Sequence, residues 1–91
     1  MTSVFQRDPN VLDELLADGS LILFHPGSQA LLALNPTGAL VWESCDGSRS
    51  VEAIARELQL VFAGATGVRQ DVDSILRELH GRGMLTVRPQ R

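Results

Sequence analysis

Few side chains in this sequence are equipped for covalent or acid–base chemistry. The chain has one cysteine, Cys45, and two histidines, His25 and His80. A cysteine attacks only as its thiolate, which usually needs a neighbouring base or positive charge. The sequence places Cys45 at a helix end among apolar neighbours, which favours a small core residue. A lone cysteine has no partner for an internal disulfide, so nothing points to an oxidising compartment.

The same residues are the only non-carboxylate candidates for a metal site. Such a site needs several converging His, Cys, Asp or Glu ligands. His25 is expected in a turn, Cys45 at a helix end and His80 on the exposed end of another helix, with no local ligand spacing. We therefore expect no metal and no cofactor.

The sequence does not match the common motifs of hydrolases or nucleotide-binding enzymes either. The sequence contains no GxSxG, HExxH or Walker loop. The glycine-bearing segment 64–67 follows no strand and is better explained as an interhelix loop. The neighbouring carboxylates Asp71 and Asp73, like Asp13 and Glu14, fit solvated faces, because acid–base catalysis needs a pocket and shifted pKa values. The sequence predicts a protein that is not an enzyme.

The length and net charge of the chain narrow the possible classes of protein. Ninety-one residues, 44% of them hydrophobic, suit one globular domain with a modest core. A net charge of -3 argues against a general nucleic-acid binder, whose affinity comes largely from Lys and Arg. There is no signal-like apolar start and no run of ~20 apolar residues. We expect a soluble cytoplasmic protein that contacts no membrane.

The first third of the chain predicts a three-stranded antiparallel meander. Residues 11–17 have both helical spacing and the pattern of a strand, but the Asp18-Gly19 dipeptide after them is a strong hairpin signal. Two apolar runs, 21–24 and 30–34, then flank a turn at Pro26-Gly27. Regular turns between such runs favour strands.

From Asn35 onward the apolar period becomes helical. Asn35 is a good N-cap, and Pro36 fits the first helical position. A short helix is expected to bury Leu40, Val41 and Trp42 and to end at Asp46-Gly47.

Two longer helices and a short strand are expected to follow. Ser50 caps a helix whose apolar stripe ends at Phe62, and a third helix spans roughly residues 68–82. Residues 84–87 then suit a short terminal strand. The order predicts a single α+β domain over residues 1–91: winged-helix-like, with a three-stranded antiparallel sheet followed by three helices. Residues 1–10 and 88–91 are expected to be loose termini.

The residues leave two candidate binding surfaces, one for DNA and one for a peptide strand. The third helix could read DNA as part of a winged-helix regulator, but Asp71, Asp73 and Glu78 would then meet phosphates. The strand at residues 29–34 carries no charge, proline or glycine to guard an edge. As an edge it could accept another strand, with the third helix as a second wall. As a central strand it would be all core, and the residues alone leave edge and core balanced.

An ordered set of motifs extends over nearly the whole chain. They are VL with Glu14, Gly19, HPG at 25–27, LNPTGALVW at 34–42, DG at 46–47, DV at 71–72 and GML at 83–85. No single motif is diagnostic, but their order is fairly specific. The sequence resembles the PqqD-like peptide chaperones, also called precursor-peptide (RiPP) recognition elements.

The resemblance implies a non-catalytic adaptor with three strands and three helices. Members bind the N-terminal leader of a ribosomally made precursor peptide, which adds as a strand antiparallel to the third strand and lies against the third helix. The resemblance implies that the backbone of residues 31–34 pairs with the leader and that the third helix meets its side chains, although some of these helix residues must be core. The implied site residues are Leu31, Leu32, Ala33, Leu34, Val68, Asp71, Val72, Ile75, Leu76 and Leu79.

Two departures bear on the subtype. Members that serve quinone-cofactor biosynthesis usually carry an Asn-x-Ser-Ala type corner and a Trp near the final Gly, where this chain has Asn35-Pro36-Thr37-Gly38 and Gly83-Met84. The corner is more similar to standalone members from lasso-peptide clusters, whose partner is a separate leader peptidase. Other standalone members work with radical SAM enzymes. An exposed edge strand would also allow a strand-paired homodimer.

Overall fold

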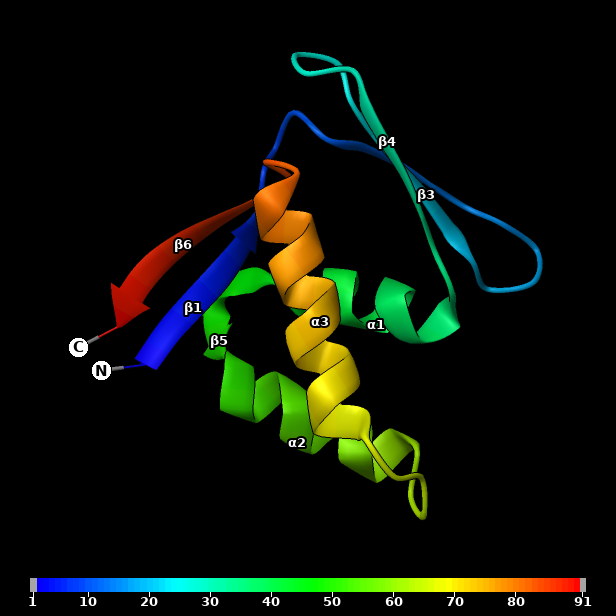
Figure 1. The fold of residues 1–91 in the computed structure, drawn as a ribbon, viewed down its shortest axis with the longest axis vertical. Coiled ribbons are helices and arrows are strands. Elements are labelled where there is room, and N and C mark those ends of the chain that lie inside the picture. The colour runs from blue at the N-terminus through cyan, green and yellow to red at the C-terminus, as the bar shows by residue number, and fades with distance from the viewer. Residues whose placement is uncertain (1, 91) are drawn as a thin grey trace.

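The computed structural model describes residues 2–90, which form two three-stranded antiparallel sheets and three helices (Figure 1). The predicted α+β class, with a three-stranded sheet followed by three helices, is confirmed. The strands are β1 (Thr2–Arg7), β2 (Leu12–Leu15), β3 (Leu21–His25), β4 (Ala30–Leu34), β5 (Asp46–Ser50) and β6 (Leu85–Gln90). The helices are α1 (Pro36–Ser44), α2 (Val51–Val61) and α3 (Val68–Gly81).

The predicted meander is the sheet β2-β3-β4. The strand interpretation of residues 11–17 is confirmed for Leu12–Leu15. The turn that follows uses Gly19 at φ 90°, a left-handed conformation that favours glycine. Leu21 and Leu23 of the middle strand are buried, and Leu34 and Leu32 lie opposite them on β4. Because β4 is an outer strand of this sheet, the edge interpretation is confirmed and the central-strand interpretation is wrong.

A second sheet, ordered β5-β1-β6, was not predicted. The expectation of loose termini is wrong for the described residues, because β1 is its central strand and β6 pairs with it as far as Gln90. The expected helix end at Asp46-Gly47 is also wrong, since α1 ends at Ser44 and the dipeptide begins β5. These pairings join distant segments, such as Phe5 opposite Val87, which no local pattern reveals. The start of β1 and the end of β6 therefore lie side by side (Figure 1).

The helix starts follow the predicted capping chemistry. Asn35 Oδ1 accepts a hydrogen bond from the Gly38 backbone N–H at 2.8 Å, with Pro36 at the first helical position. Ser50 Oγ likewise accepts from the Ala53 N–H at 3.1 Å and begins α2. Each cap satisfies one of the N–H groups that a helix start leaves unpaired.

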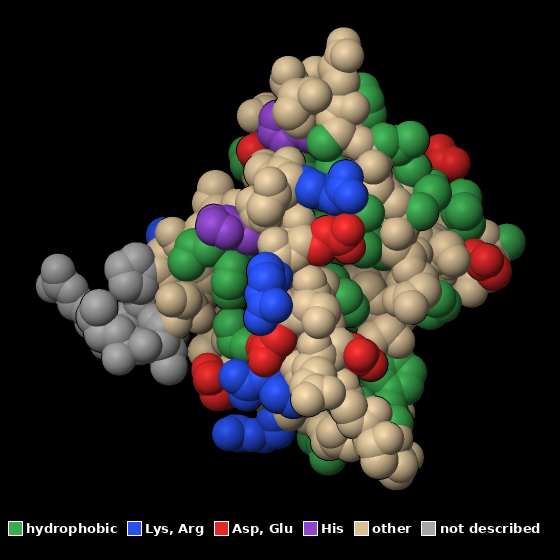
Figure 2. Space-filling view, in the orientation of Figure 1, with side chains coloured by type: hydrophobic (Ala, Val, Ile, Leu, Met, Phe, Trp, Pro, Cys, Tyr) green, Lys and Arg blue, Asp and Glu red, His purple; other side chains and the backbone are tan. Residues whose placement is uncertain are grey.

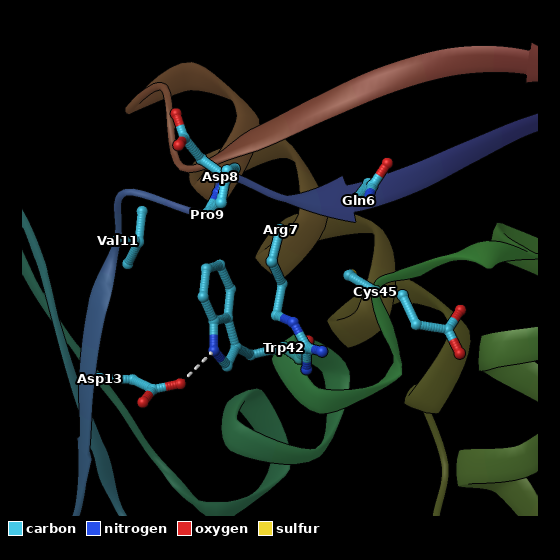
Figure 3. Close-up of a pocket in the computed structure, with 9 residues that line it drawn as sticks. Gln6, Arg7, Asp8, Pro9, Val11, Asp13, Trp42 and Cys45 are labelled. Atoms are coloured by element: carbon cyan, nitrogen blue, oxygen red, sulfur yellow. Dashed lines mark hydrogen bonds between the residues drawn. The ribbon is translucent and has the colours of Figure 1, made fainter.

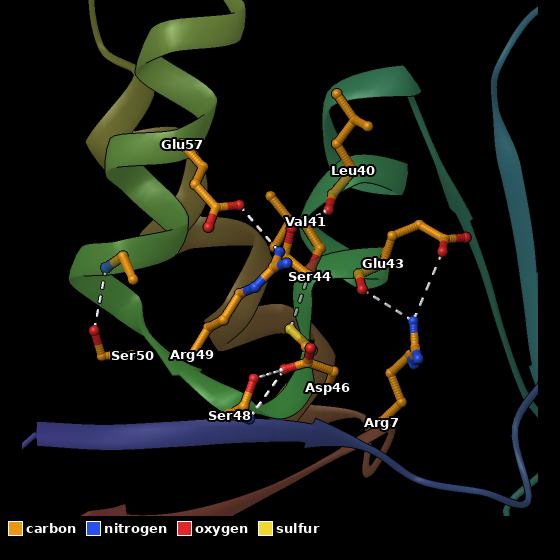
Figure 4. Close-up of polar contacts among 12 residues, drawn as sticks. Arg7, Leu40, Val41, Glu43, Ser44, Asp46, Ser48, Arg49, Ser50 and Glu57 are labelled. Carbon is orange, nitrogen blue, oxygen red and sulfur yellow. Dashed lines mark hydrogen bonds and ion pairs between the residues drawn. The ribbon is translucent and has the colours of Figure 1, made fainter.

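Helix α1 contacts both sheets, and Trp42 makes its contact with the β2-β3-β4 sheet. The Trp42 side chain is 1% exposed, and its indole N–H donates to Asp13 Oδ2 of β2 at 3.1 Å. On the opposite side, the Arg7 guanidinium of β1 donates to the Glu43 carbonyl at 3.1 Å near the C-terminus of α1 (Figure 4). The prediction that Leu40 is buried is wrong, because it is 39% exposed on the outer face of this short helix.

Three aspartates hold tight turns outside the helices. The side chains of Asp8, Asp18 and Asp46 each accept a hydrogen bond from the backbone N–H two residues ahead. The N–H of Asn10 lowers the pKa of Asp8, that of Ser20 lowers the pKa of Asp18, and the hydroxyl and N–H of Ser48 lower the pKa of Asp46. Hydrogen bonding to the charged form is the common cause.

These shifts predict acid sensitivity. Because the folded pKa values lie below the unfolded value of ~3.9, the stabilisation is complete above that pH and is lost as pH falls through the folded values. We expect the free energy of unfolding to decrease as pH is lowered below ~4. An Asp8→Asn/Asp18→Asn/Asp46→Asn variant keeps the turn acceptors and should show a shallower decrease. Urea unfolding at several pH values measures both slopes, and equal slopes would contradict the assignment.

Candidate functional site

Strand β4 has one paired and one open side. It pairs with β3 on one side, and among residues 2–90 no strand pairs with the other. Leu32 and Leu34 point to the same face as the buried Leu21 and Leu23, whereas Leu31 points outward and is 63% exposed. An edge of this kind presents backbone N–H and C=O groups that another strand can use.

A groove of about 420 Å³ lies beside this edge. One wall comes from the end of β4 and the start of α1, and the other from α3. We call it the β4–α3 groove, and it is lined by Ala33, Leu34, Asn35, Thr37, Gly38, Asp71, Ser74, Ile75 and Glu78. Gly38 allows the start of α1 to lie close to the end of β4, because a Cβ at this position would lie only 3.1 Å from Leu34 Cβ. Figure 2 shows this face of the molecule, with hydrophobic side chains exposed over the β2-β3-β4 sheet on the right.

The structure divides the predicted α3 residues into two sets. Asp71 is exposed and Ile75 is half-buried, and both line the groove. The other four belong to the hydrophobic core and do not line this groove. These core residues are Val68, Val72, Leu76 and Leu79.

The predicted β4 residues divide as well. Ala33 and Leu34 line the groove, Leu32 is half-buried against the core, and Leu31 faces away on the outer surface. Ser74 and Glu78 also line the groove and were missed by sequence reasoning. Their spacing from Asp71, three and seven residues, places them on the same helix face and was the available signal.

The charged side chains that line this groove are all acidic. Of its nine lining residues, Asp71 and Glu78 are acidic and none is Lys, Arg or His. Glu78 Oε2 lies 3.4 Å from Arg82 Nη2 in an exposed pair. Within residues 2–90 Asp71 makes no ion pair. The groove therefore combines an apolar floor at Leu34 and Ile75 with an acidic rim.

A second hollow, of about 290 Å³, lies where β1, β2 and α1 meet (Figure 3). Three of its charged groups already have partners within the fold: Asp13 accepts from the Trp42 indole N–H, Arg7 donates to α1 carbonyls, and Asp8 Oδ2 lies 3.2 Å from His25 Nε2. Burial raises the pKa of the Cys45 thiol to about 12. The thiolate is therefore scarce at neutral pH, and the prediction of a core cysteine is confirmed by its complete burial.

A third hollow, of about 360 Å³, separates α3 from the β5-β1-β6 sheet and is largely apolar, with Phe5, Leu76 and Val87 in its lining. In the described part of the chain no three His, Cys, Asp or Glu side chains converge as metal ligands would. None of the described helices is long and apolar enough to cross a membrane.

The fold defines a small α+β domain in which a strand with one open edge lies beside a helix. The chain belongs to the PqqD family, because the family described as coenzyme PQQ synthesis protein D (PqqD) matches residues 20–85. The resemblance inferred from the ordered motifs is thus confirmed. The match includes the β3-β4 hairpin and all three helices.

Two curated relatives agree with this membership. A "PqqA binding protein" from Acinetobacter baylyi (strain ATCC 33305 / BD413 / ADP1) is 31% identical over 81 residues, which cover 89% of this chain and 79% of the relative. A protein of the same name from Rahnella aquatilis is 29% identical over 87 residues, covering 96% and 88%.

Solved structures share the fold. TbiB1 in complex with the TbiA(beta) leader peptide matches with a TM-score of 0.74 and 18% identity over 88% of this chain and 93% of that chain. The heterocyclase TruD matches with a TM-score of 0.66 and 20% identity over 94% of this chain and 12% of the heterocyclase. A heterocyclase in complex with substrate and cofactor gives 0.67 and 21%, over 99% and 11%. In both heterocyclases the matching part is a small share of a much longer chain.

Proposed function

We propose that this protein is a non-catalytic adaptor that captures the N-terminal leader of a ribosomally synthesised precursor peptide and presents it to a processing enzyme. The observation that carries the proposal is the unpaired β4 edge beside a groove formed with α3. Family membership, relatives named for PqqA binding, and a fold shared with TbiB1, solved with a leader peptide, support it.

In this proposal the leader binds by strand addition. It pairs antiparallel to β4 through the backbone of residues 31–34, which extends the β2-β3-β4 sheet by one strand. Side chains of a strand alternate between two faces, so every second leader residue would enter the groove towards Ile75 and Asp71. Backbone pairing contributes affinity with little sequence demand, and the groove contributes specificity.

We further propose that the processing enzyme is a leader peptidase of lasso-peptide biosynthesis acting in the cytoplasm, with a radical SAM enzyme as the alternative. The NPTG corner at residues 35–38 supports the first choice. In the matching heterocyclases this fold is part of the enzyme chain, at 12% and 11% of its length. A separate adaptor would have to bind its enzyme through a second surface, so that leader and active site are held together.

Titration separates this function from a DNA-binding regulator. The probes are a fluorescent synthetic peptide that covers the leader of a precursor reading frame neighbouring the gene, and a random-sequence DNA duplex, at ~150 mM salt. We expect binding at micromolar or lower peptide concentration and no duplex binding. Duplex binding without peptide binding would instead support a regulator.

Hydrogen exchange then tests the binding mode. Added leader should slow exchange of backbone amides in β4, because strand addition gives them new acceptors. Strand β2, at the other edge of the same sheet, is the internal control and should be unchanged. Protection of β2 or of α2 in place of β4 would contradict strand addition.

A further inference from the structure

We infer that the β4–α3 groove selects leaders with a basic residue, an apolar residue and a second basic residue at alternate positions of one strand: basic–x–apolar–x–basic. The inference rests on the proposed function, because it specifies the inward-facing side chains of a peptide that already pairs with β4. It follows from the order of side chains on α3, from their charge and from their spacing.

The order comes from one face of α3. Asp71, Ser74, Ile75 and Glu78 all line the groove. Their spacing of three, four and seven residues is that of one helical stripe. Ile75 lies between the two acids and is half-buried, so it offers apolar surface at the centre of the groove. A ligand strand that lies beside the end of β4 and runs along α3 would meet acid, apolar and acid in turn.

Both acids are available to a ligand. Asp71 has no ion pair within residues 2–90, and the Glu78–Arg82 pair is exposed and contributes little. Asp73, by contrast, faces away from the groove and lies 3.2 Å from Arg69, which also reaches Glu52 at 3.2 Å. The other groove residues carry no charge. The start of α1 also faces the groove and adds a partial positive charge, which the Asn35 cap on the Gly38 N–H reduces.

The spacing of the acids fixes the spacing in the peptide. A rise of 1.5 Å per residue separates Asp71 from Glu78 by ~10.5 Å along the helix. Same-face residues of a strand lie ~6.8 Å apart at a separation of two and ~13.5 Å apart at a separation of four. A separation of two leaves no position between them for the residue that faces Ile75. A separation of four residues provides that position. Long Lys or Arg side chains can span the ~3 Å difference between the spacing along the strand and the spacing along the helix. The pattern is symmetric, so it holds for either strand direction.

A peptide selection tests the pattern directly. The probe is a display library of random linear peptides selected on the full chain and on an Asp71→Asn/Glu78→Gln variant. An Asp73→Asn/Glu52→Gln variant is the matched control, because it changes the net charge equally outside the groove. We expect the full chain and the control to enrich the basic–x–apolar–x–basic pattern, and the groove variant to lose the basic positions.

One selected peptide then gives the magnitude. Two partly exposed charge pairs predict a Kd about tenfold higher for the groove variant, and no change for the control. Exchanging the two basic residues for glutamate should weaken binding to the natural chain, and an Asp71→Lys/Glu78→Lys variant should restore it. Equal effects of the groove and control variants would overturn the inference, because they indicate a general charge effect.

Hydrogen exchange distinguishes a failure of the inferred sequence pattern from a failure of the proposed leader capture. Selected peptides that protect β4 without carrying basic residues would overturn the inferred pattern and leave leader capture by strand addition standing. Peptides that protect no part of β4, or a selection that enriches none, would overturn both.

Discussion

Replacing Trp42 with alanine is expected to lower the free energy of unfolding by about 3–5 kcal/mol. The indole is almost completely buried between α1 and the β2-β3-β4 sheet, so truncation leaves a large cavity at the joint between helices and sheet. A domain of this size has a total stability of about 5–14 kcal/mol. The substitution therefore removes a large share of it, and urea unfolding followed by far-UV circular dichroism measures the loss.

Trp42→Phe separates packing from hydrogen bonding. Phenylalanine fills much of the same space but cannot donate to Asp13 Oδ2. Asp13 is exposed, so water can solvate the freed oxygen, and we expect a loss of about 1–2 kcal/mol. A loss as large as that of Trp42→Ala would show that the bond to β2, and not core packing, is the main contribution. Trp42 is the only tryptophan, so circular dichroism is the signal common to all three proteins.

Local chemistry made much of this fold predictable. The caps at Asn35 and Ser50 and the Asp18-Gly19 turn depend on residues within a few positions of each other, and all three formed as expected. The resemblance to the PqqD family and the α+β class followed from motifs of the same local kind. Helical periodicity likewise identified the apolar stripe of α3, most of which is core.

The second sheet illustrates what sequence patterns could not show. β1 is mostly polar, and its only fully buried hydrophobic side chain is Val4. It forms because β5 and β6, distant in the chain, lie on either side of it and supply its backbone partners. The groove shows the same limit, since periodicity could not separate Ile75 from its buried neighbours on α3. Whether a side chain of α3 enters the groove or the core depends on the distance between α3 and β4, which periodicity does not give.

The two sheets also divide their contributions to the proposed function. The β5-β1-β6 sheet packs near one side of α3, where Phe5 lies edge-on to His80 with ring centroids 6.3 Å apart. The buried stripe of α3 fixes the helix to the core. Its opposite face is thereby held at a set distance from β4, whose outer edge pairs with no strand of residues 2–90. In this way a rigid helix and an open strand together give a preorganised groove, which lowers the ordering cost of binding.

Replacing Ile75 with lysine is expected to weaken leader binding strongly while leaving the fold intact. The change removes the central apolar contact, which is worth about 1–2 kcal/mol, or roughly 5- to 30-fold in Kd. The new ammonium lies four residues after Asp71 and three before Glu78, so it can pair with both acids and occupy the groove. It also repels a basic ligand. We expect the Kd for the leader peptide to rise at least ~100-fold.

Stability and a matched control decide whether that loss is local. Ile75 is only half-buried, so the flexible lysine stem can lie along the apolar surface with its charge in water, and we expect unfolding to change by less than ~2 kcal/mol. Leu60→Lys makes the same chemical change on α2, at a side chain that is 76% exposed and does not line the groove. It should leave leader binding unchanged. If Leu60→Lys weakened binding as much as Ile75→Lys while both proteins stayed folded, the effect would come from net charge, and the β4–α3 groove would not be the leader site.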